Sequence, residues 1–207
     1  MSPGQFRQTH EQSSRVLESA SQAAPQRLHY TDSDEANALL ASDPMALLIG
    51  FALDQQVTVQ TAFAGPLKIK ERLGTLDPGA LAALDPTELE AAFRERPAVH
   101  RFPGSMASKV AALCAHVEAE YGGDASRLWR EAGDSDELRR RIEALPGFGR
   151  MKVTALGSVL AKRFGVEAAQ GLAPSHPTLG DVDSREALER YQEAKRAHKA
   201  KLRAQQS

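Results

Sequence analysis

Cysteine is almost missing from this 207-residue sequence, because Cys114 is the only one. One thiol cannot form a disulfide within the chain, and it cannot supply the several thiolates of a zinc or iron–sulfur site. Long apolar runs are missing too: the longest, Met45–Leu53, has nine residues, about half of the roughly 18 to 20 that span a bilayer. No basic segment followed by an apolar one opens the sequence. We therefore expect a cytoplasmic protein with no membrane contact.

Aromatic residues are scarce, at 5% of the sequence, which argues against a protein that binds single strands by stacking many bases. The net charge of the whole chain is only −1. The charge is uneven along the chain, since residues 145–207 hold 11 Lys and Arg against 6 Asp and Glu, and residues 1–144 hold 15 against 21. This asymmetry fits a C-terminal region that faces a polyanion, although a lysine-rich terminal helix alone also produces it.

The first 27 residues consist largely of Ser, Gln and Ala and have few large apolar side chains. Burial of such a segment cannot repay the entropy of ordering it, so we expect a disordered tail. The rest of the sequence has no alternation of apolar and polar residues that would indicate strands. An all-α fold of short helices is therefore predicted.

Several helix boundaries can be predicted from capping residues. Asp43-Pro44 and Asp85-Pro86 are typical helix starts, because Asp accepts first-turn amide hydrogens and Pro tolerates the first helical position. Apolar residues at helical spacing predict a helix from Ser105 to about Tyr121. Pro66 should kink or split the helical stretch 58–73.

The most informative segment is 136–165, which predicts two helices joined by the hairpin Leu145-Pro-Gly-Phe-Gly149. Gly147 and Gly149 permit backbone angles that are closed to other residues, and Phe148 can fill the gap where the helices cross. The second helix begins with free amide hydrogens, the positive end of its dipole, and the neighbouring Arg150 and Lys152. Such a site binds a phosphate without reading a base sequence.

The hairpin resembles that of the helix-hairpin-helix GPD superfamily of base-excision DNA glycosylases, which includes endonuclease III and its relatives. Upstream, Leu53-Asp-Gln-Gln-Val57, expected on an apolar helix, is similar to the family's Leu-Ser-Gln-Gln segment. The stretch from Arg101 to Lys109 is similar to the family's "G-x-x-x-x-K-A" stretch. The resemblance covers residues 34 to 165 and implies a two-lobed helical DNA-glycosylase-like fold. The expected parts are a tail (1–27), the glycosylase-like domain (28–183) and a basic C-terminal helix (184–207).

The resemblance implies a base-excision-repair protein that binds double-stranded DNA with a damaged or mismatched base. Its reaction would be hydrolysis of the N-glycosidic bond of a flipped base by a monofunctional glycosylase, which in a bacterium would work at the nucleoid. Separately, we expect a monomer, since nothing in the sequence suggests an obligate partner. The implied DNA-binding residues are Gln55, Gln56, Arg101, Lys109, Gly147, Phe148, Gly149, Arg150, Met151 and Lys152. By motif position, backbone carbonyls of Glu143, Leu145 and Phe148 would bind a monovalent cation. No other cofactor and no iron–sulfur cluster are expected.

The sequence departs from the family's pattern at its catalytic positions. Bifunctional members carry an attacking lysine two residues after the second hairpin glycine, where this chain has Met151, and a thioether cannot form a Schiff base. Lys152 is adjacent, but one residue along a helix turns a side chain by about 100°. The family's aspartate about twenty residues after that glycine has no counterpart in the stretch 168–173. The candidate carboxylates that remain are Asp54, Glu167, Asp181 and Asp183.

These residues also have structural interpretations. Asp181 and Asp183 are more typical of an N-cap for the helix that starts at Ser184, and the basic residues of that helix are more typical of a solvated face than of a phosphate-tracking one. The missing aspartate favours a second function, a non-catalytic module that binds damaged DNA, whereas the Gln-Gln segment favours an enzyme. A third alternative is a helical protein-interaction domain without any role on nucleic acid.

Overall fold

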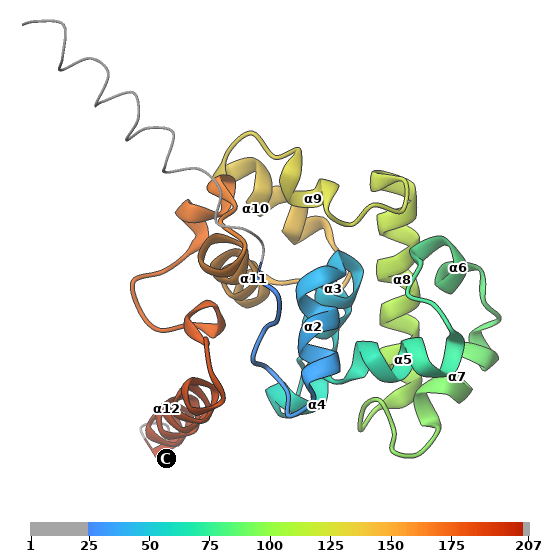
Figure 1. Cartoon of the computed structure of the whole chain (residues 1–207), viewed down its shortest axis with the longest axis horizontal. Helices are drawn as coiled ribbons and strands as arrows, with labels where there is room; N and C mark the ends of the chain where they lie inside the picture. Colours follow the sequence, from blue (N-terminus) through green and yellow to red (C-terminus); the bar gives the residue numbers. More distant parts are fainter. Residues whose placement is uncertain (1–24, 205–207) are drawn as a thin grey trace, which may run out of the picture.

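The computed structural model describes residues 25–204, and all of the regular structure in this range is helical (Figure 1). The predicted all-α fold is therefore confirmed. Of the expected tail, residues 1–24 lie outside the described part of the chain. No single described helix is long and apolar enough to cross a membrane, and only one bent pair, the first two helices at 114°, passes a test of length and composition. The helices are α2 (Asp34–Ser42), α3 (Pro44–Leu53), α4 (Val59–Phe63), α5 (Gly65–Leu73), α6 (Pro78–Ala83), α7 (Pro86–Arg94), α8 (Pro103–Tyr121), α9 (Arg127–Arg130), α10 (Ser135–Ala144), α11 (Arg150–Arg163), the 3₁₀ turns η1 (Glu167–Leu172) and η2 (Leu179–Asp181), and α12 (Arg185–Ala204).

Local capping chemistry sets most of these boundaries. The Asp43 side chain accepts amide hydrogens of Met45 and Ala46 at the start of α3, and Asp85 caps α7 in the same way. Pro66 lies in the first turn of α5, so the predicted split of the stretch 58–73 into two helices is confirmed. Helix α8 starts two residues before the predicted Ser105, because Pro103 suits the first helical position.

Helix α3 forms the centre of the core, since every residue from Met45 to Leu53 is buried. Helices α5 to α8 lie on one side of it, and α10 to α12 with the two 3₁₀ turns lie on the other (Figure 1). The rings of Phe51 and Tyr30 both meet Phe63 edge to face, at centroid distances of 5.1 and 5.0 Å. Helix α3, with its C-terminal end, therefore lies at the junction between the two groups of helices.

The sequence prediction was wrong about the residues that follow α3. The stretch Leu53–Val57 was expected on an apolar helix, but the helix ends at Leu53, and residues 54–57 form a tight turn. The carbonyl of Ala52, in the last turn of α3, accepts a hydrogen bond from Lys152, one hundred residues away in the sequence, and a local pattern cannot reveal such a contact.

Candidate nucleic-acid interface

The predicted hairpin is present between α10 and α11. The Phe148 amide donates to the carbonyl of Leu145 at 3.0 Å, and the Phe148 side chain is buried, as expected for a residue that fills the gap between the helices. Gly147 has a φ of +80°, in the left-handed region that favours glycine. Gly149 has an extended backbone, with φ −100° and ψ −179°, so the expectation that this position requires glycine's conformational freedom was wrong.

The start of α11 presents backbone amides on an exposed surface. Within residues 25–204, the amide hydrogens of Gly147, Gly149, Arg150 and Met151 have no hydrogen-bond acceptor. A Cβ added to either glycine would meet nothing within 4 Å, so the surface above both is open. Since these amides lie at the positive end of the α11 dipole, the hairpin can accept an anion by its backbone alone.

The Lys152 side chain turns inward, whereas Met151 is 85% exposed. The Nζ atom of Lys152 donates to the carbonyl of Ala52, in the last turn of α3, at 3.2 Å, and lies 4.9 Å from the centre of the Phe148 ring. Burial lowers the pKa of Lys152 to about 8; the charge of Lys109 adds to this shift, and that of Asp54 opposes it. This amine thus joins the first turn of α11 to the negative end of the α3 dipole.

The turn after α3 holds its first glutamine inward and its second outward. Gln55 Nε2 donates to the carbonyl of Ala52 at 2.7 Å. Gln56 is exposed, with a φ of +57°, and is the only described residue other than glycine with a positive φ. A left-handed backbone costs a residue with a Cβ roughly 1–2 kcal/mol. The surrounding contacts therefore impose the conformation that presents Gln56 to solvent.

Two residues from other segments fix Gln55. Lys109 Nζ donates to its side-chain oxygen at 2.8 Å, and His100 Nε2 donates to its carbonyl at 3.0 Å. His100 Nδ1 accepts the amide hydrogen of Phe102 at 3.1 Å. Burial lowers the pKa of His100, which suits a neutral ring with one proton, on Nε2. These contacts give the buried His100 ring a structural role between the glutamine turn and the segment that precedes α8.

Sequence reasoning missed Phe102, one of two large apolar side chains exposed among the described residues, the other being Met151. It is 41% exposed, and the guanidinium of Arg101 lies 4.6 Å from its ring centre. The chain from His100 to Phe102 is bonded to Gln55, so Phe102 and Gln56 belong to neighbouring segments. The only signal in the sequence was an aromatic residue directly before a helix-starting proline.

Of the four candidate carboxylates, Asp54 is the one at this junction. Its charge raises the pKa of Lys152 in α11 and that of Tyr191 in α12. Tyr191 is partly buried, and its pKa is raised by burial and further by Asp54. Asp54, the residue directly after α3 and next to the glutamine turn, is therefore near enough to both the hairpin helix and α12 for its charge to act on them.

Asp181 is engaged elsewhere. Its carboxylate accepts from Lys162 Nζ at 2.8 and 2.9 Å and from the Thr178 amide at 2.7 Å, so it caps η2. The predicted cap of the last helix by Asp181 or Asp183 was wrong, because Ser184 Oγ accepts the first-turn amide of α12 at 3.1 Å.

The stretch that carries an aspartate in the family forms η1 here. It packs against α11 and contains no acidic side chain after Glu167, which is exposed. Asp183 is exposed as well. None of the described contacts brings Glu167 or Asp183 to the junction that holds Asp54.

No group of three or more His, Cys, Asp or Glu side chains within the described residues is arranged to hold a metal ion. The expected monovalent cation would need only the carbonyls of Glu143, Leu145 and Phe148. Leu145 already accepts the Phe148 amide there, which leaves its carbonyl one lone pair for an ion. The cation stays a prediction.

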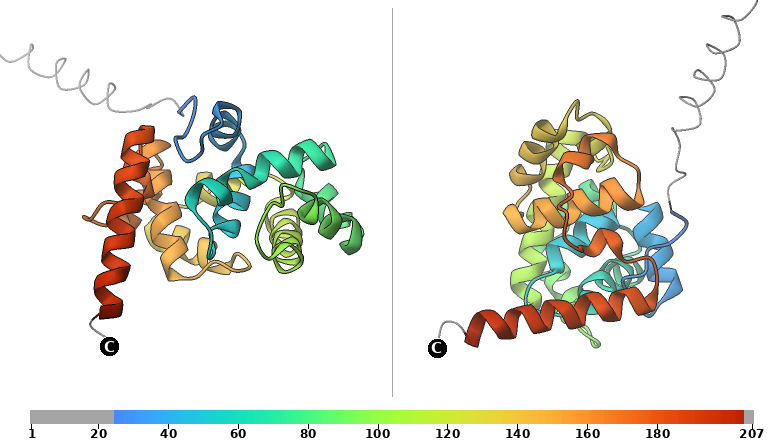
Figure 2. Two further views of the ribbon diagram at one scale, coloured as in Figure 1. Left: turned by 90° about the horizontal axis from the view of Figure 1, so that it is seen from below. Right: turned by 90° about the vertical axis from the view of Figure 1, so that its left-hand side faces the viewer.

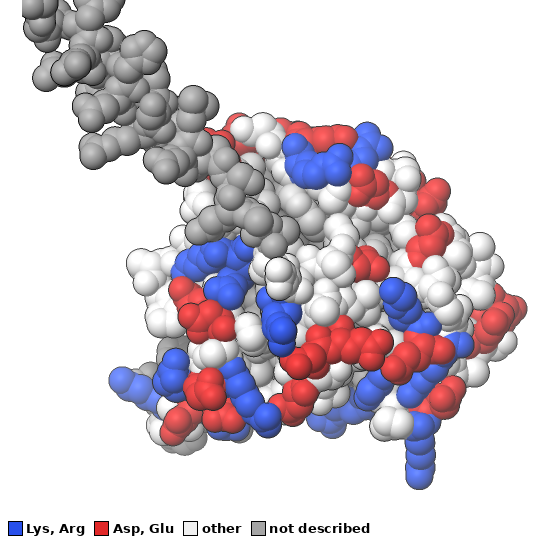
Figure 3. Space-filling view, in the orientation of Figure 1, with Lys and Arg blue, Asp and Glu red and all other residues white. Residues whose placement is uncertain are grey.

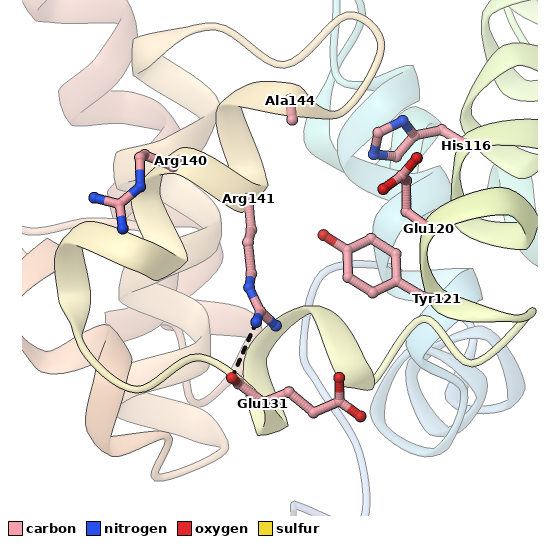
Figure 4. Close-up of a pocket in the computed structure, with 7 residues that line it drawn as sticks. All are labelled: His116, Glu120, Tyr121, Glu131, Arg140, Arg141 and Ala144. Atoms are coloured by element: carbon pink, nitrogen blue, oxygen red, sulfur yellow. Dashed lines mark hydrogen bonds between the residues drawn. The ribbon is translucent and has the colours of Figure 1, made fainter.

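A cavity of about 380 Å³ lies between α8 and α10 (Figure 4). It contains none of the predicted site residues. Arg141 bridges its floor, with bonds to the carbonyl of Glu131 at 3.0 Å and to the carboxylate of Glu137 at 2.6 Å. These contacts hold α9 and α10 together, and they leave this arginine with its charge neutralised.

Comparison with known proteins gives one match. The model of a family described as HhH-GPD superfamily base excision DNA repair protein matches residues 49–207, more than half of the chain. No curated protein and no solved structure matches the chain. The matched range contains the hairpin, the glutamine turn, Asp54 and α12.

Proposed function

Because this chain belongs to the HhH-GPD superfamily of base excision DNA repair proteins, we propose that it is a monofunctional DNA glycosylase whose carboxylate is Asp54. The observation that carries the proposal is that Asp54 directly follows α3, beside the glutamine turn, and that its charge acts on both Lys152 of the hairpin helix and Tyr191 of α12. No other candidate carboxylate shares this position.

The hairpin holds the duplex. A phosphate binds to the open amides at the start of α11, and Arg150 adds a positive charge at the same surface. Gly149 has an ordinary backbone and no neighbour at its Cβ position, so its lack of a side chain serves the approach of the DNA backbone rather than the fold.

The glutamine turn and Phe102 open the duplex. The glycosidic carbon is unreachable inside a stacked helix, so the target nucleotide must leave the stack. Gln56 enters the vacated space and the apolar Phe102 inserts between neighbouring bases. The bonds of Gln55 to Lys109 and of its carbonyl to His100 keep the two probes in position.

Hydrolysis then needs one carboxylate and one water molecule. Asp54 accepts a proton from the water molecule while the oxygen of the water forms a bond to the sugar C1′ carbon. The C1′–N bond breaks, and its electron pair goes to the base. The negative charge of Asp54 also stabilises the sugar cation that develops as the base leaves. Lys152 is a positioning residue in this scheme, because its ammonium holds the end of α3, and with it Asp54, against the hairpin helix.

A non-catalytic damage-binding module is the second candidate. The acid-free η1 favours it, because the position where the family carries its aspartate has no carboxylate in this chain. Such a module needs the hairpin and the probes but has no use for Asp54.

The test is a panel of duplexes carrying uracil, 8-oxoguanine opposite C or A, alkylated adenine, hypoxanthine or thymine glycol, with base release and binding measured in parallel. We expect release of one base, with strand breaks only after alkali. Asp54→Asn should lower the single-turnover rate by about 100-fold or more with binding retained. The matched control, Asp183→Asn, removes an exposed carboxylate away from this junction and should leave the rate unchanged.

Two results would contradict the proposal. Binding without release of any base would favour the damage-binding module. Strand cleavage without alkali would show a bifunctional enzyme and would make Lys152 the amine to examine.

A further inference from the structure

Helix α12 consists of two halves that differ in charge and in contact with the rest of the molecule. The first half is attached to the core: Leu188 is buried, Tyr191 is partly buried, and Arg185 pairs with Asp32 at 3.0 Å. Its charges are mixed, and Arg185 also lies 3.8 Å from Glu189.

The second half is basic and exposed. No acidic residue follows Glu193 in the sequence, and the described side chains of Lys195, Arg196 and Lys201 are exposed. None of the ion pairs among the described side chains involves these three residues. A fold that needed this half for packing would give it an apolar face, and the described positions from 193 on are all exposed.

The position of α12 shows on which side of the molecule this positive charge lies. Gln192 Nε2 donates to Gln60 Oε1 at 2.6 Å, which fixes α12 to α4, the helix that follows the Gln56 turn. Figure 2 shows that α11 and α12 run antiparallel, so the C-terminal end of α12 projects past the body on the same side as the start of α11. The hairpin and the basic half of α12 therefore lie toward the same side of the molecule.

From these observations we propose that the C-terminal half of α12, residues 195–204, is a second DNA-binding arm that contacts phosphates of the same duplex that the hairpin holds. The helix beyond Gln192 reaches about 18 Å, at 1.5 Å per residue, which corresponds to about five base pairs along a strand. On the face drawn in Figure 3, by contrast, acidic and basic side chains are interspersed. The arm rests on the proposed function, since it assigns a further contact to the same duplex.

The test is the salt dependence of binding to an undamaged duplex. The variant Lys195→Gln/Arg196→Gln/Lys201→Gln keeps helix-forming side chains and removes three charges. We expect its affinity to fall by about tenfold or more near physiological salt, and the slope of log K against log salt to fall by about 0.9 per lost contact. The matched control, Lys70→Gln/Arg94→Gln/Arg130→Gln, removes three exposed charges from α5, α7 and α9 and should change the slope by less than a third as much.

An unchanged slope of log K against log salt in the arm variant, with a normal helical circular dichroism spectrum, would overturn the proposal that α12 carries a DNA-binding arm. So would equal slopes in the arm variant and the control, because binding would then depend only on total charge. Failure of the proposed glycosylase is distinguishable, because absence of base release by the unmodified protein leaves the slope comparison intact. An unmodified protein that binds no duplex at low salt would overturn both proposals.

Discussion

The hairpin and the glutamine turn face the same junction, but they present opposite parts of the chain. The hairpin buries its one large side chain, Phe148, and leaves backbone amides open. In the turn after α3, His100 and Lys109 hold the carbonyl and the side chain of Gln55, and the Gln56 side chain is presented to solvent. Backbone amides bind a phosphate of any sequence, whereas a side chain can test what occupies a space. Under the proposed function, the hairpin therefore holds the DNA backbone, and the glutamine turn probes the position of the extruded nucleotide.

The largest effect is expected at the hairpin. Gly147→Asp places a carboxylate at the proposed phosphate site, and like-charge repulsion should lower duplex affinity by about 100-fold or more. Gly147→Asn has nearly the same shape and the same left-handed backbone without the charge, so it should lose only a few-fold. Fluorescence anisotropy with a labelled duplex measures both. Equal losses in the two variants would mean that the backbone conformation, and not an anion site, accounts for the effect.

Truncating the two proposed probes, Gln56 and Phe102, should separate base release from DNA binding. Gln56→Ala combined with Phe102→Ala should lower the rate of base release by about 10- to 100-fold, because the extruded nucleotide is no longer replaced in the stack. Affinity for an undamaged duplex should change by less than about threefold, since the phosphate contacts remain. Single-turnover release and anisotropy give the two values. A parallel loss of both would show that the turn also holds DNA.

The Lys152 link should make binding depend on pH. A phosphate at the hairpin favours the charged amine, so DNA raises the pKa of Lys152 above its free value of about 8 and binding takes up a proton. Affinity should therefore be highest below pH 8 and fall by up to about tenfold as pH rises through 8 to 9. Lys152→Met keeps the length of the side chain and should abolish this dependence. A pH profile that is identical in the variant would remove Lys152 from the explanation.

The smallest effect concerns the strain of the turn. Gln56→Gly relieves the left-handed backbone but adds freedom to the unfolded chain, so the free energy of unfolding should rise by less than about 1 kcal/mol. Gln56→Ala keeps the strain and should not stabilise the protein. Urea unfolding followed by circular dichroism compares the two. A clear destabilisation by glycine would show that the Gln56 side chain supports the fold.

The same two regions show how far sequence reasoning reaches. The hairpin was predicted correctly in its bounds and in the role of Phe148, because Pro146 and Gly147 act on their own neighbours. The end of α3 was predicted wrongly, because Lys152 bonds to Ala52 across one hundred residues of chain and His100 bonds to Gln55 across 45. Phe102 escaped notice for a related reason, since its exposure depends on packing that no local pattern describes.

The bond from Lys152 to Ala52 has a consequence for how this protein would search DNA. It joins α11, which we propose binds a phosphate at its start, to α3, which ends in the glutamine turn, so under the proposed function the distance between the phosphate contact and Gln56 is fixed. A protein that slides along a duplex with this fixed distance examines one nucleotide for each phosphate it holds, always at the same offset. The inward Lys152 thus fixes the spacing between the bound phosphate and the inspected nucleotide, and this spacing does not depend on the base sequence of the DNA.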